Sequence, residues 1–181
     1  VQAWELFDGA LRSVICHLVN NLSPIKAYGR LSECAGTNAS QLVVWRGWAS
    51  DRIEWRDVTS LNHLGKSVLS SSRNLEVAYT FADSFISCFI LDENVSVIDV
   101  ELFFGSANKF LICADGECET IIGPGCRFVL VPGETQAEQE SNINVFKDEI
   151  KPQIEDFEKD CLEDGGDTQK PHIVYYHVHP N

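Results

Sequence analysis

The sequence predicts an α+β fold in a single domain spanning residues 1–181. Helical patterns lie near the start and near the end of the chain, and short runs rich in β-branched and aromatic residues fill the middle and the end. A length of 181 residues suits one domain with an ordinary hydrophobic core. We expect a mainly helical part over about 1–40 and a β-rich core over about 41–181.

The first half of the chain contains two expected helices that flank two expected strands. Apolar residues recur at three- and four-residue intervals over residues 2–22, which predicts an amphipathic helix. The runs QLVVWRGW (41–48) and SVLSSS (67–72) predict strands. NLEVAYTFADSF (74–85) predicts a helix, because Asn74 is a favourable N-cap residue and a glutamate follows it in the first turn.

The second half is mainly composed of short apolar runs. We expect strands in CFIL (88–91), VSVIDVELFF (95–104), KFLI (109–112), ETIIG (119–123), RFVLV (127–131) and HIVYYHVH (172–179). The acidic segment 147–167 predicts a solvated helix face followed by a loop, and a docking surface for a basic partner is the alternative.

The charge of the chain restricts the classes of ligand. The formal net charge is −13, so the protein repels phosphates at long range, and general nucleic-acid binding is not expected. An anionic cofactor would have to be held by a few well-placed cations. No apolar run has the length of a membrane span, so we expect no transmembrane segment.

The seven cysteines do not form a metal-binding or redox motif. Their number is odd, and no C-x-x-C motif occurs, which argues against a zinc ribbon and against a thioredoxin-like redox protein. Cys16 and Cys88 lie in apolar stretches and are expected to be buried. Sequons at Asn21, Asn38 and Asn94 are compatible with secretion, but such short motifs also arise by chance.

Two histidines, His177 and His179, alternate along the last expected strand. Histidines without nearby partner ligands are more typical of surface polar residues, so we expect no metal site. Cys118 lies between two glutamates and is expected to point away from them, which argues against a catalytic thiol.

Three groups of residues that could take part in binding or catalysis follow one another along the chain. Arg46 ends an apolar run, a serine triplet occupies residues 70–72, and Glu117 and Glu119 begin a later run. Residues two apart on a strand point the same way, so both carboxylates would share one face. Their repulsion would raise the pKa of one of them.

In their order and context these motifs resemble the R-S-E class of mono-ADP-ribosyltransferases, which includes bacterial toxins and vertebrate arginine-specific enzymes. VVWRGW resembles the strand-Arg-Gly signature, VLSSSRNLEVAYTFA the Ser-Thr-Ser strand and its helix, and ECETIIGPGCRFVLV the Glu-x-Glu strand. The resemblance covers residues 41–131, about half of the chain, and departs from the family where Ser71 replaces threonine. It implies a split mixed β-sandwich core with flanking helices.

The resemblance also implies an activity. Family members break the nicotinamide–ribose bond of NAD+ and transfer ADP-ribose to an acceptor, through a transition state like that of glycoside hydrolysis. Glu119 would hold the ribose 2′-hydroxyl and stabilise the developing positive charge. Glu117 would orient or deprotonate the acceptor, and a glutamate here favours arginine as the acceptor side chain.

The remaining motif residues would bind the cofactor. Arg46 would grip the phosphates and ribose, and Gly47 would allow close approach to the nicotinamide amide. Phe81 would stack on nicotinamide, unless it is a core aromatic of its helix. The hydroxyls of Ser70, Ser71 and Ser72 would complete the cofactor site. Ser70 would bond the catalytic glutamate or the ribose.

Three alternatives share these residues: an NAD+ glycohydrolase with water as acceptor, a transferase to a non-arginine acceptor, and a catalytically silent NAD-binding module. The expected partners are NAD+ and an acceptor protein whose identity the sequence does not give. The family favours a secreted or host-delivered effector or toxin, and the sequons are compatible with a eukaryotic secretory or cell-surface enzyme.

Overall fold

The computed structural model describes residues 42–48, 61–63, 65–66, 68–83, 85–92, 95, 97–100, 118–163 and 172–181. Within these ranges the protein is α+β, as the sequence predicts. The expected helix over 2–22, the KFLI strand, the three sequons and Glu117 lie outside the described residues.

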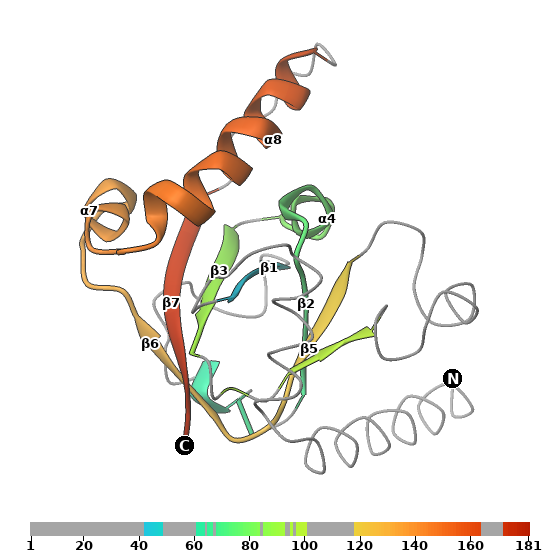
Figure 1. The fold of residues 1–181 in the computed structure, drawn as a ribbon, viewed down its shortest axis with the longest axis vertical. Helices are drawn as coiled ribbons and strands as arrows, with labels where there is room; N and C mark the ends of the chain where they lie inside the picture. Colours follow the sequence, from blue (N-terminus) through green and yellow to red (C-terminus); the bar gives the residue numbers. More distant parts are fainter. Residues whose placement is uncertain are drawn as a thin grey trace.

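A mixed seven-stranded sheet forms the body of the described structure (Figure 1), in the order β4-β5-β2-β1-β3-β7-β6. Strands β3 and β7 are parallel, and the other neighbouring pairs are antiparallel. The strands are β1 (Leu42–Trp48), β2 (Leu69–Ser72), β3 (Phe85–Leu91), β4 (Val97–Asp99), β5 (Glu119–Ile122), β6 (Cys126–Leu130) and β7 (His172–Pro180).

The sheet has two parts that meet at a short contact. Strand β1 pairs with β3 along its whole length, from Leu42 opposite Leu91 to Trp48 opposite Phe85. With β2 it shares a single registered pair, Trp45 opposite Ser72. The unit β4-β5-β2 therefore joins the unit β1-β3-β7-β6 through few backbone contacts, and side chains must contribute to the junction.

Strand β3, near the centre of the sheet, is buried on both faces, and its sequence is almost continuously apolar. Every residue of β3 is buried. Because successive side chains of β1 point to opposite faces, Val44 and Trp48 pack in one hydrophobic cluster. Val43 and Trp45 pack in the other. The thiol of Cys88 lies in the second cluster, where burial raises its pKa, and its expected burial is confirmed.

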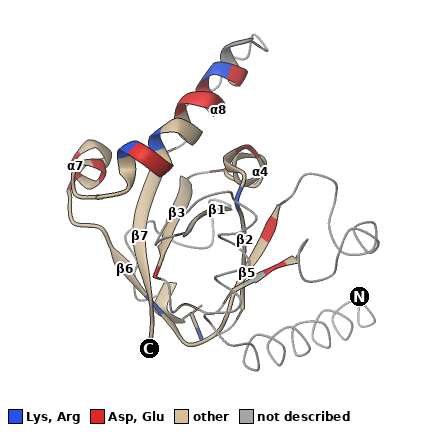
Figure 2. Ribbon diagram, in the orientation of Figure 1, with Lys and Arg blue, Asp and Glu red and all other residues tan. Residues whose placement is uncertain are grey.

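Four helical elements of the described structure gather near the same end of the central strands, toward the top of Figure 1. They are α4 (Leu75–Thr80), α7 (Gln136–Ser141), the π-helical turn η2 (Phe146–Ile150) and α8 (Lys151–Glu163). Helix α8 corresponds to the expected acidic helix, and Figure 2 shows charged residues of both signs along its length. None of the helices in the described ranges combines the length and the hydrophobicity that a membrane span requires.

Two element boundaries differ from the sequence prediction. The helix expected over 74–85 ends at Thr80, and Phe85 already begins β3. The backbone N–H of Asp83 donates to the carbonyl of Trp48 (3.0 Å), which returns the chain to the sheet. The strand expected over 95–104 ends at Asp99.

Helix α7 was not expected from the sequence. Its N-terminus is a capping box, in which the Thr135 hydroxyl accepts from the backbone N–H of Glu138 and the Glu138 carboxylate accepts from the backbone N–H of Thr135. In the sequence, the T-x-x-E spacing of Thr135 and Glu138 is the pattern that indicates the start of this helix.

Gly47 lies where the end of α4 crosses β1. A Cβ atom on Gly47 would lie 2.0 Å from the carbonyl oxygen of Ala78 and 2.7 Å from the backbone nitrogen of Ala82. Both contacts are with backbone atoms, so a side-chain rotation cannot relieve them. The glycine therefore sets how closely α4 approaches the strand that carries Arg46.

We predict that Gly47→Ala destabilises the protein by about 1–3 kcal/mol, because α4 must move away from β1 to accommodate the methyl group. Urea unfolding followed by circular dichroism measures the change. An unfolding midpoint equal to that of the wild type would contradict the close packing.

Candidate active site

Ser70 connects two of the sequence-predicted site residues. Its hydroxyl donates to Oε1 of Glu119 at 2.7 Å, and its backbone carbonyl accepts a hydrogen bond from Nη1 of Arg46. The three residues come from β1, β2 and β5; Arg46 precedes Ser70 by 24 positions, and Ser70 precedes Glu119 by 49. The fold therefore brings a guanidinium, a hydroxyl and a carboxylate together at one residue.

The pairing of β2 with β5 explains the bond between Ser70 and Glu119. Ser70 lies opposite Ile121, and Ser72 lies opposite Glu119. Alternation places Ser70 and Glu119 on the same face of this antiparallel pair, as diagonal neighbours within reach of a long side chain. Because the hydroxyl donates to a carboxylate, the bond is charge-assisted and fixes the orientation of that carboxylate.

Arg46 crosses the short junction between the two parts of the sheet. It extends from β1 and donates to the carbonyl of Ser70 on β2, in the region where those strands share one registered pair. Its guanidinium carbon lies 4.6 Å from the centre of the Trp48 ring, within the range of a cation–π interaction. The cation is thus held on both sides of the junction.

The other two serines of the triplet have hydroxyls directed into the protein. Ser71 donates to the carbonyl of Thr120 at 2.7 Å, and the Ser72 hydroxyl accepts from the backbone N–H of Asn74 at 2.9 Å. Both serines are buried, whereas Ser70 is exposed. The hydroxyls of Ser71 and Ser72 therefore support the strand and the following turn, and Ser70 is the member of the triplet that a ligand can reach.

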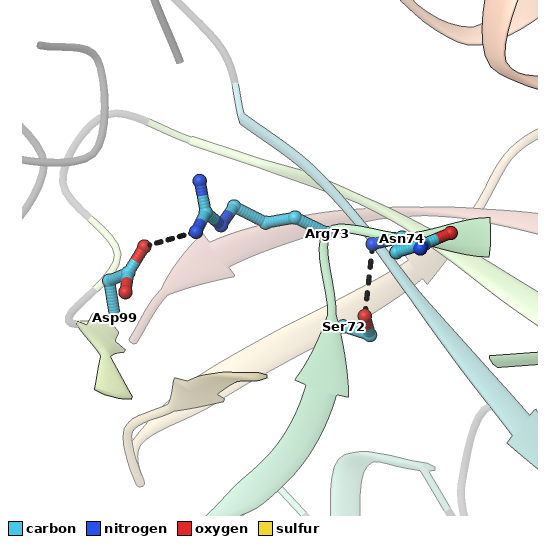
Figure 3. A network of polar contacts seen from close by, with 4 residues as sticks. All are labelled: Ser72, Arg73, Asn74 and Asp99. Carbon is cyan, nitrogen blue, oxygen red and sulfur yellow. Dashed lines mark hydrogen bonds and ion pairs between the residues drawn. The ribbon is translucent and has the colours of Figure 1, made fainter. Parts of the chain in front are cut away.

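A turn after β2 directs the chain into α4 (Figure 3). The carboxamide oxygen of Asn74 accepts from the backbone N–H of Glu76, as expected of an N-cap residue. Arg73 reaches across to β4, where its Nη2 lies 2.9 Å from Oδ2 of Asp99. The Asp99 side chain is only 2% exposed, so this ion pair ties the end of β2 to β4 from within the structure.

Phe81 lies at the C-terminal cap of α4 and is 63% exposed. It is therefore not the core aromatic that the sequence allowed as an alternative. Its backbone carbonyl carbon is 2.8 Å from the position of a Cβ on Gly47, which places the residue beside the strand position that follows Arg46. A large exposed aromatic ring here is available for stacking against a planar ligand.

The approach to Glu119 is sharply bent. Cys118 has a φ of 46°, in the left-handed region, and its carbonyl accepts from the backbone N–H of Arg73 at 3.1 Å. The second expected acid, Glu117, lies outside the described residues. Its relation to Glu119 remains an expectation from the sequence.

Two histidines near the end of β7, His177 and His179, form a separate group. The rings of His177 and His179 stack at 6.1 Å, and Nδ1 of His179 lies 3.5 Å from Oδ2 of Asp92. Burial, together with the neighbouring His179, lowers the pKa of His177. Within the described part of the chain, no group of three potential metal ligands was found.

Two features of this region were not identified from the sequence. Trp48 follows Arg46 by two positions, so strand alternation was a usable signal that they share a face. Asp99 is the first acid in an otherwise apolar run, which marks a buried carboxylate in need of a partner. The pairing of Asp99 with Arg73 depends on tertiary structure, so no pattern in the sequence indicates it.

The site combines groups with complementary chemistry. A guanidinium suits a phosphate or pyrophosphate, because its planar fork bonds two oxygens at once. A fixed carboxylate suits a sugar hydroxyl or a developing positive charge. An exposed ring at Phe81 suits a planar heterocycle.

Comparison with known proteins does not assign the chain to a family. No family model matches it, and no curated protein sequence matches it significantly.

We predict that Asp99→Asn lowers the free energy of unfolding by about 3 kcal/mol, because it leaves the Arg73 charge opposite a neutral amide in a largely buried position. Glu155→Gln is the matched control, since Glu155 pairs with Lys151 at 3.4 Å on the surface of α8 with both side chains more than half exposed. That change should cost about 0.5 kcal/mol or less. Equal losses in the two variants, measured by urea unfolding, would contradict a structural role for the Arg73–Asp99 pair.

Proposed function

We propose that the protein is a mono-ADP-ribosyltransferase that cleaves NAD+ between nicotinamide and ribose and transfers ADP-ribose to a protein side chain, with arginine as the expected acceptor. The observation that carries the proposal is the convergence on Ser70: Arg46 bonds its carbonyl, and its hydroxyl bonds Glu119. These residues are the three elements of the R-S-E pattern, and the family resemblance, rather than any local pattern, implied that they would meet.

The proposed binding mode assigns one part of NAD+ to each group. The pyrophosphate lies against the Arg46 guanidinium, which supplies the local cation that a protein of net charge −13 needs to hold an anion. The nicotinamide ring stacks near Phe81. The ribose between them lies over Ser70 and Glu119, and its 2′-hydroxyl donates to the carboxylate.

In the proposed reaction the C1′–N bond breaks, and its electron pair leaves with neutral nicotinamide. The ribose then carries positive charge shared between C1′ and the ring oxygen, as in an oxocarbenium ion. Glu119 stabilises this charge electrostatically, and the hydrogen bond from Ser70 fixes the orientation of its carboxylate before the reaction. An acceptor nitrogen forms the new bond to C1′ and loses its proton to Glu117.

Gly47 has a specific part in this arrangement. Its missing side chain allows the end of α4 to approach β1, and this packing places Phe81 beside the residue that follows Arg46. The glycine thus supports the proposed nicotinamide position through the helix. The buried hydroxyls of Ser71 and Ser72 likewise act on the protein rather than on the cofactor.

We predict that Glu119→Gln lowers the rate of nicotinamide release from NAD+ by at least about 100-fold, because it removes the charge that stabilises the transition state while keeping the size of the side chain. Release is measured by chromatography, and Tm is measured in parallel to establish that the variant is folded. Glu155→Gln on α8 should release nicotinamide at the wild-type rate. A Glu119→Gln variant with wild-type activity would eliminate the proposed role.

Glu117→Gln should separate transfer from hydrolysis. If Glu117 deprotonates the acceptor, this variant loses labelling of an arginine-containing protein to a greater extent than it loses nicotinamide release. Radiolabelled NAD+ with a mixture of acceptor proteins measures both quantities in one reaction. Strong nicotinamide release without labelled protein in the wild type would instead identify an NAD+ glycohydrolase.

A further inference from the structure

Trp48 is the residue on which the Arg46 guanidinium rests. The two side chains share one face of β1, and the guanidinium carbon lies 4.6 Å from the indole centroid. Trp48 is only 6% exposed, so one side of this contact is shielded from water. A cation–π contact strengthens as it is desolvated.

The indole itself is fixed on two sides. Its Nε1–H donates to the hydroxyl of Ser87 at 2.8 Å, and Ser87 is fully buried on β3 directly opposite Arg46. Its ring also stacks with that of Phe85, at a centroid distance of 6.2 Å and an angle of 25° between the rings. A ring held in this way offers Arg46 one defined surface.

A buried hydroxyl bonded to a buried indole connects the core to the proposed site. The chain of contacts runs from Ser87 on β3 to Trp48 and Arg46 on β1, and then to Ser70 on β2 and Glu119 on β5. Every step joins neighbouring strands or two residues of one strand. It also spans the short junction between the two parts of the sheet.

We infer that Trp48 is a positioning residue for Arg46, and that Ser87 acts through Trp48 by fixing the indole. The inference rests on the proposed function for its ligand, the pyrophosphate of NAD+. An arginine side chain loses considerable rotamer freedom when it is immobilised by a ligand. Because Trp48 orders the guanidinium beforehand, less freedom remains to be lost on binding, and affinity for the pyrophosphate increases.

The same strand contains a matched control. Trp45 is also fully buried, and its Nε1–H donates to Oε1 of Gln153 at 2.8 Å. It belongs to the other hydrophobic cluster, on the face of β1 opposite Trp48. Ser87→Ala and Gln153→Ala therefore each remove the acceptor of one buried indole N–H on β1, and only Ser87→Ala acts on the ring beneath Arg46.

The first arm of the test needs no ligand. The proton resonances of the Arg46 side chain, assigned with Arg46→Lys, should carry the ring-current shift of an indole. Ser87→Ala and Trp48→Phe should move these resonances, whereas Gln153→Ala and Trp45→Phe should leave them in place. Resonances that stay unchanged in both Ser87→Ala and Trp48→Phe would overturn the inference.

The second arm measures NAD+ binding by calorimetry. Ser87→Ala and Trp48→Phe should weaken binding by about 3- to 30-fold, the range that corresponds to losing part or all of a cation–π contact. In activity assays KM should rise while kcat stays within about threefold, because Arg46 binds the ligand away from the bond that breaks. Equal weakening in the Gln153→Ala and Trp45→Phe controls would show a general effect on β1 and overturn the inference.

The two arms distinguish failure of the inference from failure of the proposed function. A wild-type protein that does not bind NAD+ would end the proposed function, and with it the role of Trp48 in NAD+ affinity. The resonances of Arg46 would still decide whether Trp48 positions the guanidinium. Tm values of the four variants establish that each is folded at the temperature of the measurement.

Discussion

The hydrogen bond from Arg46 to the carbonyl of Ser70 is the contact on which the rest of the site depends. The two parts of the sheet share one registered backbone pair at β1 and β2, and this side-chain bond joins them nearby. Because the Ser70 hydroxyl bonds Glu119, the same residue also relates the guanidinium to the carboxylate. Moving β2 relative to β1 would therefore separate the cation from the acid.

The surrounding structure restricts such movement. Strand β1 is paired along its whole length with a strand that is buried on both faces, so the base of Arg46 is rigid. The end of β2 is held by the ion pair of Arg73 with Asp99 and by the turn at Ser72 and Asn74. A buried ion pair is a weak source of stability compared with apolar packing, but it specifies one arrangement of the strands that carry it. We interpret this pair as such a constraint.

The sequence was sufficient to predict the elements that carry the site. The runs around Arg46, Ser70 and Glu119 were each predicted to be a strand, and each proved to be one. Their convergence followed from the family resemblance, since no local pattern states which strands are neighbours. The structure adds the hydrogen bonds that connect them, while the activity remains a proposal.

Other features could not be predicted, for identifiable physical reasons. Helix α4 ends at Thr80 because a backbone bond from Asp83 returns the chain to β1, a tertiary contact that competes with helix propensity. The exposure of Phe81 follows from that early end. The different roles of the three serines depend on the face of β2 that each occupies, which Ser70 and Ser72 share, and on the turn that begins at Ser72; three identical residues carry no such information.

In the proposed binding mode, Arg46, Ser70, Glu119 and Phe81 surround one NAD+ molecule. Titration of isotope-labelled protein with NAD+, followed by the backbone and side-chain resonances, is the decisive test of this arrangement. We expect the largest shifts at these four residues, with saturation at a single affinity. Shifts confined to the histidines of β7 or to α8, or no shifts at millimolar NAD+, would contradict it.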